Sequence, residues 1–255
     1  MKVVILAGGR GTRISEESIV RPKPMVEIGG EPILWHIMKI YAHYGFDEFI
    51  ICAGYKQHMI KDYFNKYALY HSDITFDFQN KDNFKVSQNY AEPWRVTVVD
   101  TGYDTQTSKR IKMIEPYIGN ERFMLTYGDG VSDINISDLL EFHKSHRKIC
   151  TLTATKPESR FGFLDLSGNE VKSFREKSQN DVGYINSGFM VMEPKVFEYL
   201  GENVMLETEP MMNLTRNGEV MAYRHEGFWQ CMDTLRDKMR LENLSNTGNA
   251  PWKVW

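Results

Sequence analysis

An unbroken apolar run near the start of the chain, Val3–Ala7, is followed at once by a glycine-rich loop, Gly8–Arg13. A continuous apolar run of this length predicts a strand covered on both faces, as in a parallel sheet with helices on either side. Glycines directly after such a strand permit a sharp turn and a close approach of the backbone to a bound group. The free N–H groups of such a turn can hold phosphate oxygens. The opening of the chain therefore predicts an α/β fold with a candidate anion-binding loop at the edge of its sheet.

The loop belongs to neither of the two best-known classes of phosphate-binding loop. Walker A requires a Gly-Lys pair at a fixed distance after its first glycine, and none follows Gly8 at that distance. The dinucleotide fingerprint, started from Gly9, fails at Ile14, where a small residue is required. Taken alone, a tight turn without any ligand explains the loop equally well.

Basic residues close to the loop favour a polyphosphate ligand. Arg13 closes the loop, and Lys23 follows it between Pro22 and Pro24. Proline fixes its own φ and restricts the residue before it, so this segment presents one ammonium group on a stiff backbone. A solvated surface lysine is the usual alternative, but the loop, Arg13 and Lys23 together make a polyanion site the better interpretation.

Two carboxylates are candidates for a metal site. Asp129 lies between Gly128 and Gly130, after the predicted strand Phe123–Tyr127, at the sheet edge where open α/β folds bind ligands. Asp233 precedes the last predicted helix, so it either caps that helix or reaches the site. Mg²⁺ takes hard oxygen ligands and keeps waters or substrate phosphates as the rest. Two such carboxylates can therefore share a magnesium ion.

Alternating strands and helices fill the rest of the chain, so we predict a mixed, mainly parallel, Rossmann-like α/β sheet with helices on both faces and a small strand-rich insertion. No repeat, low-complexity tract or linker is present, and we expect one domain over residues 1–255. Further expected strands are Phe49–Ala53, Ile74–Phe78, Val96–Val99, Cys150–Thr155, Phe163–Asp165, Val171–Phe174, Tyr184–Met192 and Glu219–His225. Expected helices run from Pro32 to Gly45, and over Met59–Tyr67, Ser137–His146, Glu209–Asn217 and Thr234–Leu244. Ser137 is the expected cap of its helix, with His143 and His146 on a polar face rather than on a metal.

The composition excludes several classes of protein. With 255 residues, a net charge of −3 and 42% hydrophobic residues, the chain is not intrinsically disordered. Its N-terminal apolar run is far shorter than the ~20 residues of a membrane span, and it is too short for a signal-peptide core. The slightly acidic balance argues against nucleic-acid binding. Cys52, Cys150 and Cys231 lie far apart, so we expect reduced thiols in a cytoplasmic protein.

The last segment, residues 245–255, contains two tryptophans, Trp252 and Trp255. Large apolar side chains at a terminus either pack back on their own domain or contact another subunit. The sequence leaves both alternatives open.

These motifs together resemble the signature of the sugar-phosphate nucleotidyltransferases, also called NDP-sugar pyrophosphorylases. The resemblance rests first on the loop from Leu6 to Arg13, with Lys23-Pro24-Met25 at the family's spacing. It continues through Gly128-Asp129, Phe161-Gly162, Glu176-Lys177, Asn186-Ser187-Gly188 and Asp233, and it covers essentially the whole chain. It implies a nucleotide-diphospho-sugar transferase-like fold.

The resemblance also implies roles for individual residues. Those expected to hold the nucleotide and its phosphates are Leu6, Ala7, Gly8, Gly9, Arg10, Gly11, Thr12, Arg13, Lys23, Thr105, Arg110 and Gly128. Those expected to hold the sugar phosphate are Gly162, Glu176, Lys177 and Asn186. The expected catalytic residues are Arg13, Lys23 and Asp129, and Asp129 and Asp233 are the expected Mg²⁺ ligands.

Within the family, segments such as Pro24–Gly30, Thr126–Val131 and Gly227–Gln230 are most similar to the branch that uses CTP and glucose 1-phosphate. The resemblance therefore implies Mg²⁺-dependent transfer of CMP from CTP to α-D-glucose 1-phosphate, with CDP-glucose and pyrophosphate as products. It places the reaction at the first step toward CDP-linked dideoxyhexoses of surface polysaccharide. It also implies a homo-oligomer.

No serine or cysteine lies in a recognisable nucleophile motif, so we predict direct in-line attack by the sugar phosphate without a covalent intermediate. The same chemistry with UTP or dTTP is an alternative, because base choice depends on a few hydrogen bonds that a sequence does not display. A non-catalytic subunit that senses nucleotide or sugar phosphate is a remote alternative. Such a relic should lose its charged site residues, whereas this chain keeps Arg13, Lys23, Asp129, Lys177 and Asp233.

Overall fold

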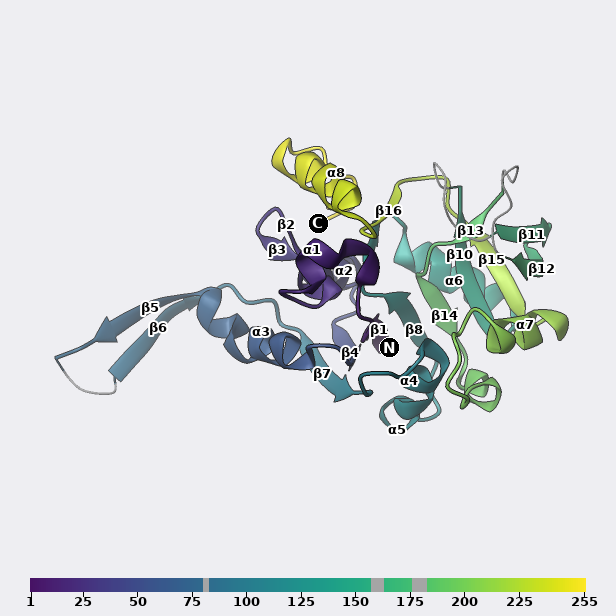
Figure 1. The fold of residues 1–255 in the computed structure, drawn as a ribbon, viewed down its shortest axis with the longest axis horizontal. Coiled ribbons are helices and arrows are strands. Elements are labelled where there is room, and N and C mark those ends of the chain that lie inside the picture. The colour runs from purple at the N-terminus through teal and green to yellow at the C-terminus, as the bar shows by residue number, and fades with distance from the viewer. Residues whose placement is uncertain (80–82, 157–162, 176–182) are drawn as a thin grey trace.

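The computed structural model describes residues 1–79, 83–156, 163–175 and 183–255, and within these ranges a mixed ten-stranded sheet forms the centre of the fold (Figure 1). Its strands are β1 (Val3–Ala7), β4 (Glu48–Ala53), β7 (Arg95–Asp100), β8 (Phe123–Tyr127), β10 (Cys150–Thr155), β11 (Phe163–Ser167), β12 (Glu170–Arg175), β13 (Ile185–Asn186), β14 (Met190–Met192) and β15 (Val220–Arg224). They lie in the order β11-β12-β15-β10-β14-β8-β1-β4-β7, with β13 paired to β10 beside this path. The predicted mixed α/β sheet is confirmed.

One half of the sheet is parallel. β1 runs parallel to both of its neighbours, β4 and β8, and β7 extends this half beside β4. β14 runs antiparallel to β8 and to β10. The parallel half therefore brings the carboxyl ends of β1, β4 and β8 to one edge.

Side chains that alternate along the central strands divide the core into two layers. In β1, Val3 and Ile5 belong to one layer, and Val4 and Leu6 belong to the other, as expected for a strand buried on both faces. The helices α2 (Ile33–His43), α3 (Gln57–Tyr70), α6 (Ile136–His146) and α8 (Leu235–Asn246) pack in the first layer, and α4 (Thr107–Met113), α5 (Glu115–Ile118) and α7 (Glu209–Arg216) pack in the second. Among the described helices, none has the length and apolar character that crossing a bilayer needs.

The described chain also contains shorter elements. They are the helix α1 (Ser15–Ser18), the 3₁₀ turns Thr12–Ile14, Lys23–Met25 and Pro194–Tyr199, and the strand pairs β2 (Glu27–Ile28) with β3 (Glu31–Pro32) and β9 (Gly130–Ser132) with β16 (Trp229–Cys231). The expected strand-rich insertion includes β5 (Ser72–Asp77) and β6 (Asn83–Asn89), which form a separate two-stranded hairpin. We did not predict β6, because its alternation of apolar and polar residues is short and rich in Asn, Ser and Lys.

The expected single strand Tyr184–Met192 is wrong in its middle. The chain forms β13 and β14 there, with Ser187, Gly188 and Phe189 between them. Gly188 has φ +80° and Phe189 has φ +47°, and these left-handed conformations cannot continue a strand. The apolar composition predicted burial correctly, but it did not reveal the kink.

Two expectations about α6 are also wrong. The helix is capped by Asn135, whose side chain accepts from the N–H groups of Ser137 and Asp138, so Ser137 is not the cap. His143 is only 1% exposed and does not lie on a polar face. Its ring contacts Thr151 Oγ1 at 2.7 Å and Glu193 Oε1 at 3.1 Å, so the histidine belongs to a buried hydrogen-bond network.

The end of the chain packs against the N-terminal half of the molecule. Trp252 is fully buried, and its indole N–H donates to Nδ1 of His36 at 3.3 Å. The other ring nitrogen of His36, Nε2, donates to the carbonyl of Ile28 at 2.8 Å. These partners select the neutral ring with its proton on Nε2. Trp255 stays 37% exposed, and its part in subunit contacts remains a prediction.

We expect the buried His36 to make stability depend on pH. Burial lowers the pKa of His36 from 6.5 to about 4. The folded state therefore binds the proton more weakly than the unfolded state. The contribution of His36 to the free energy of unfolding is complete above its unfolded pKa of 6.5. It is lost as the pH falls from there toward about 4.

Urea unfolding of the wild type and of His36→Asn checks this expectation. Asparagine keeps an acceptor for Trp252 and does not titrate. Between about pH 7.5 and about pH 5, the wild type should lose about 2 kcal/mol more of its free energy of unfolding than the variant. An identical pH dependence in the two proteins would contradict this role of His36.

Candidate active site

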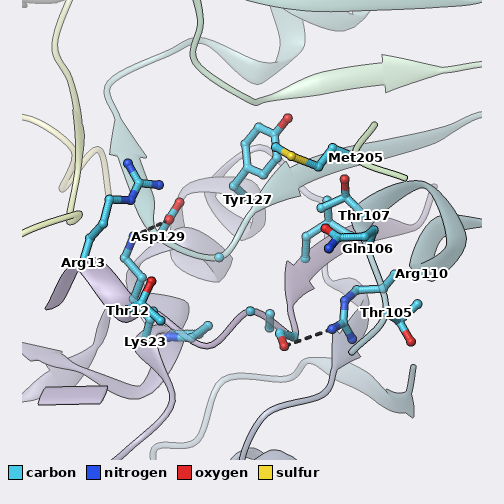
Figure 2. A pocket seen from close by; sticks show the side chains of 17 residues that line it. Thr12, Arg13, Lys23, Thr105, Gln106, Thr107, Arg110, Tyr127, Asp129 and Met205 are labelled. Atoms are coloured by element: carbon cyan, nitrogen blue, oxygen red, sulfur yellow. Dashed lines mark hydrogen bonds and ion pairs between the residues drawn. The ribbon is translucent and has the colours of Figure 1, made fainter. Parts of the chain in front are cut away.

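A pocket of about 350 Å³ lies at the carboxyl ends of β1 and β8 (Figure 2). Its walls come from segments that are distant in sequence: the loop after β1, the pair Lys23-Pro24, residues 105–107 with Arg110 around the start of α4, and the end of β8 with Asp129. The carboxyl edge of a parallel sheet is where α/β folds bind their ligands. The glycine loop and Asp129, assigned to this edge from the sequence, meet in one cavity.

Lys23 lies at the centre of an ion-pair cluster at one end of the pocket. Its Nζ donates to Asp129 Oδ2 at 2.6 Å and to Asp233 Oδ1 at 2.5 Å, and Arg13 Nη1 donates to the other oxygen of Asp233 at 2.5 Å. Lys23 itself is 8% exposed. Burial lowers its pKa, but the two carboxylates outweigh burial and leave the pKa raised. The lysine is therefore held as a cation between two anions.

Local backbone geometry brings Lys23 to this position. Gly11 has φ +63°, and a Cβ there would lie 3.2 Å from Cβ of Lys23. The glycine thus serves both the turn and the close approach of Lys23. Pro22 is extended at φ −67° and ψ 147°, and the 3₁₀ turn Lys23–Met25 follows it.

Asp233 is not the cap of the last helix, so that alternative is wrong. The cap of α8 is Thr234, which forms a capping box with Asp237. The backbone N–H of Thr234 donates to Asp237 Oδ2 at 2.8 Å, and the N–H of Asp233 donates to the same oxygen at 3.2 Å. Asp237 therefore satisfies the helix start and leaves the Asp233 carboxylate to Lys23 and Arg13.

Arg110 ties two walls of the pocket together. Its guanidinium donates to the carbonyl of Gly8 at 3.1 Å, to Thr101 Oγ1 at 2.6 Å and to the carbonyl of Gly102 at 2.8 Å. The residue is 3% exposed, and burial lowers its pKa. These partners are neutral, so Arg110 brings an extra positive charge to the pocket and fixes the glycine loop to the segment after β7.

The remaining residues expected to bind nucleotide occupy different places. Thr105 lines the pocket at the end away from Lys23 (Figure 2). Gly128 lies against β1, where an added Cβ would come within 2.9 Å of the Leu6 carbonyl oxygen. Arg10 does not line the pocket. It pairs with Asp104, and its guanidinium lies 4.5 Å above the Tyr103 ring.

Comparison with known proteins agrees with this geometry. The nucleotidyl transferase family matches residues 2–230, which is most of the chain and includes the glycine loop, Lys23 and Asp129. The chain belongs to this family.

Two curated nucleotidyl transferases and one solved structure are similar over nearly the full chain. The sequence is 52% identical to glucose-1-phosphate cytidylyltransferase of Salmonella typhi, over 100% of both proteins. It is 45% identical to a probable glucose-1-phosphate cytidylyltransferase of Bacillus subtilis (strain 168), again over 100% of both. HddC from Yersinia pseudotuberculosis, solved in complex with GMP-PN, has a TM-score of 0.76 at 25% identity, over 95% of this chain and 98% of that one.

Nucleotidyl transferases of this type generally use a divalent metal ion, and the cluster around Lys23 fits such an ion. Asp129 and Asp233 supply hard carboxylate oxygens that converge on one point, now occupied by the Lys23 ammonium group. The Asp129 side chain is 30% exposed. Within the described ranges, no group of three or more His, Cys, Asp or Glu side chains forms a complete metal cage. A pair of carboxylates is the usual protein share for an ion that also binds substrate phosphates.

The residues that the family resemblance assigns to the sugar phosphate are only partly visible. Gly162, Glu176 and Lys177 lie outside the described residues. Asn186 Nδ2 donates to the Tyr127 hydroxyl at 3.3 Å, and its Oδ1 accepts from the Gly188 N–H at 3.0 Å. The structure therefore places Asn186 in contact with Tyr127, which itself lines the pocket.

Several pocket residues were missed by sequence reasoning. Gln106, Thr107, Tyr127 and Met205 line the pocket, and the Tyr127 hydroxyl also donates to Glu207. Tyr127 ends a predicted core strand directly before Gly128-Asp129, and this position was a usable signal. No sequence signal connects Met205 to the site, because only the tertiary fold brings it there.

The contact between the glycine loop and Arg110 yields a test of this nucleotidyl transferase pocket. A Cβ on Gly8 would overlap the Arg110 guanidinium, whereas no described atom lies within 4 Å of a Cβ on Gly9. We expect Gly8→Ala to displace Arg110 and to raise the KM for nucleotide by about 10-fold or more, since overpacking costs about 1–3 kcal/mol. Gly9→Ala is the matched control: it adds a Cβ to the same loop without displacing Arg110, so it should raise this KM by less than Gly8→Ala does. Equal nucleotide KM values in both variants would contradict the role of this contact.

Proposed function

We propose that the chain transfers CMP from CTP to α-D-glucose 1-phosphate and releases CDP-glucose and pyrophosphate. The observation that carries this proposal is the 52% identity, over the full length of both chains, to a glucose-1-phosphate cytidylyltransferase. The pocket supports it, because a glycine loop, three cationic side chains and two carboxylates gather there.

To catalyse this transfer, the protein mainly has to neutralise and align two anionic substrates. A phosphate monoester has a second pKa of about 6, so glucose 1-phosphate is largely a dianion near neutral pH and needs no strong general base. Its oxygen attacks the α-phosphorus of CTP, the bond to the β-phosphate oxygen breaks, and pyrophosphate leaves with the electron pair. Arg13 and Lys23 neutralise the approaching anions and the leaving group, and the loop N–H groups orient the phosphates.

The residues around this reaction have distinct proposed tasks. The loop residues Leu6–Arg13, with Thr105, Arg110 and Gly128, bind the nucleotide, and Gly162, Glu176, Lys177 and Asn186 bind the sugar phosphate. Asp129 and Asp233 would hold Mg²⁺, which supplies further positive charge beside the phosphates. We further propose that the enzyme works in the cytoplasm as a homo-oligomer, at the first step toward CDP-linked dideoxyhexoses of surface polysaccharide.

Pyrophosphate release from the purified protein, with Mg²⁺ and glucose 1-phosphate, tests the proposal. CTP, UTP, dTTP, ATP and GTP are supplied separately. A strong signal with CTP alone is the expected result. A preference for UTP or dTTP would keep the reaction type and overturn the choice of base. No release with any nucleotide, from folded protein, would overturn glucose 1-phosphate as the acceptor.

A further inference from the structure

A short segment before α7, residues 203–207, is tied to the wall of the pocket that is proposed to bind the nucleotide. The N–H of Leu206 donates to Thr107 Oγ1 at 2.6 Å. The carbonyl of Val204 accepts from the N–H of Ser108 at 3.1 Å. The segment therefore has a fixed position relative to this wall. We call it the nucleotide wall, and its residues are Thr105, Gln106, Thr107 and Arg110.

The same segment reaches a second wall of the pocket through Glu207. The Tyr127 hydroxyl donates to Glu207 Oε1. Burial, together with the Glu207 carboxylate, raises the pKa of Tyr127 well above its ordinary value of 10, so the hydroxyl stays protonated. Tyr127 itself lines the pocket (Figure 2). Glu207 therefore fixes a side chain that lies next to the substrates.

Tyr127 passes this constraint on to Asn186, which is proposed to bind the sugar phosphate. The Tyr127 hydroxyl oxygen accepts from Asn186 Nδ2 at 3.3 Å. The N–H of Gly188 donates to Asn186 Oδ1 at 3.0 Å, and this bond decides which amide atom faces Tyr127. An amide nitrogen carries two hydrogens, so Asn186 can donate the second one to an oxygen of glucose 1-phosphate. A chain of hydrogen bonds thus runs from the nucleotide wall to a proposed ligand of the sugar phosphate.

The stability of the fold does not account for a glutamate at position 207. The Glu207 Oε2 atom is buried and has no hydrogen-bond partner among the described residues. A buried polar atom without a partner costs free energy of folding. The carboxylate is therefore kept at a cost, and its bond to Tyr127 gives it a role in the pocket.

We propose that Glu207 is a positioning residue for glucose 1-phosphate. It acts through Tyr127, which holds the Asn186 amide at a fixed distance from the nucleotide wall. In-line attack depends on the placement of the two substrates relative to each other, so a rigid link between their binding sites favours the reaction. The inference rests on the proposed function, because it takes glucose 1-phosphate as the acceptor and Asn186 as one of its ligands.

The KM values of the two substrates, measured separately on Glu207→Leu, test the proposal. Leucine is similar in size and cannot accept from the Tyr127 hydroxyl. The KM for glucose 1-phosphate should rise by about 10-fold, which corresponds to about one hydrogen bond. The KM for CTP should stay within about 2-fold of the wild-type value, because the N–H of Leu206 still holds the segment to the nucleotide wall. Glu207→Gln keeps an acceptor for Tyr127 and should restore most of the affinity for glucose 1-phosphate.

A second variant examines the same contact from its other side. Tyr127→Phe removes only the hydroxyl, and it should raise the KM for glucose 1-phosphate to a similar extent. The double variant Tyr127→Phe/Glu207→Leu should be no worse than either single variant, because both break one contact. Tyr199→Phe is the matched control. The Tyr199 hydroxyl accepts from Asn217 and the residue does not line the pocket, so both KM values should stay at the wild-type level.

Three results would overturn the proposal. They are a wild-type KM for glucose 1-phosphate in Tyr127→Phe and Glu207→Leu, an equal rise of both KM values, and an equal defect in Glu207→Gln and Glu207→Leu. If Glu207→Leu does not fold, Tyr127→Phe alone decides, since it removes a single oxygen atom. A wild type that released no pyrophosphate would overturn the proposed function and this inference with it. An active wild type with unaffected variants would overturn the inference alone.

Discussion

Replacing Lys23 by methionine is expected to lower the rate of pyrophosphate release by about 10²–10³-fold, the usual cost of removing one group that stabilises developing charge. Lys23 Nζ contacts Asp129 and Asp233 at 2.6 Å and 2.5 Å, and the lysine side chain is only 10% exposed. An ammonium group acts more strongly on phosphate charge there than it would in bulk water. Methionine keeps an unbranched side chain that is one atom shorter, and it removes the charge together with the N–H donors. Steady-state turnover with CTP and glucose 1-phosphate measures the effect.

The control for Lys23→Met is Lys144→Met on α6, where the lysine is 44% exposed and pairs with Glu141. This variant should keep wild-type turnover. Lys23→Met leaves two carboxylates without their shared cation, so it should also unfold at a lower temperature, whereas Lys144→Met should not. A folded Lys23→Met enzyme with wild-type turnover would remove Lys23 from the mechanism.

Those parts of the site that are formed by a few consecutive residues could be predicted from the sequence. The apolar run of β1 and the glycines after it predicted, to within a few residues, the loop that lines the pocket. Prolines on both sides indicated that Lys23 is held stiffly. The central strands β8 and β10 have the bounds expected from their apolar runs. A continuous apolar run indicates a buried strand even when the strands beside it are not known.

The sequence could not show contacts between distant segments or exceptions to local patterns. Nothing in the spacing of Asp129 and Asp233 shows that both reach the same ammonium group. Asn135 competes with Ser137 for the start of α6, and both residue types suit a cap. His143 lies on a helix of mixed polarity, and only the packing of β10 and β14 shows that it is buried. The meeting of Asp129 with Asp233 and the burial of His143 are tertiary contacts that propensity and periodicity do not encode, whereas the cap is a local choice between two suitable residues.

The last expected result distinguishes the roles of Asp233 and Asp237. The two residues lie four positions apart, but Asp233 pairs with Lys23 whereas Asp237 completes the capping box of α8. Asp233→Asn removes a charge beside the phosphates and keeps a hydrogen-bond acceptor for Lys23. We expect turnover to fall by about 10²-fold or more, since the charge that a bound metal ion supplies to a transition state is worth several kcal/mol. The Mg²⁺ concentration needed for half-maximal turnover should rise. The fold should be retained, because Lys23 still pairs with Asp129.

Asp237→Ala is the matched variant, and it should show the opposite pattern. Asp237 Oδ2 accepts from the N–H groups of Asp233 and Thr234, so its loss costs about 1 kcal/mol of the free energy of unfolding. Turnover should fall by less than about 10-fold, because Asp237 acts on the site only by holding the backbone of Asp233. Chemical unfolding and Mg²⁺ titrations of turnover, run on both variants, decide between the two roles. If Asp237→Ala lost turnover and Asp233→Asn lost only stability, the metal would have to be assigned to carboxylates other than Asp233.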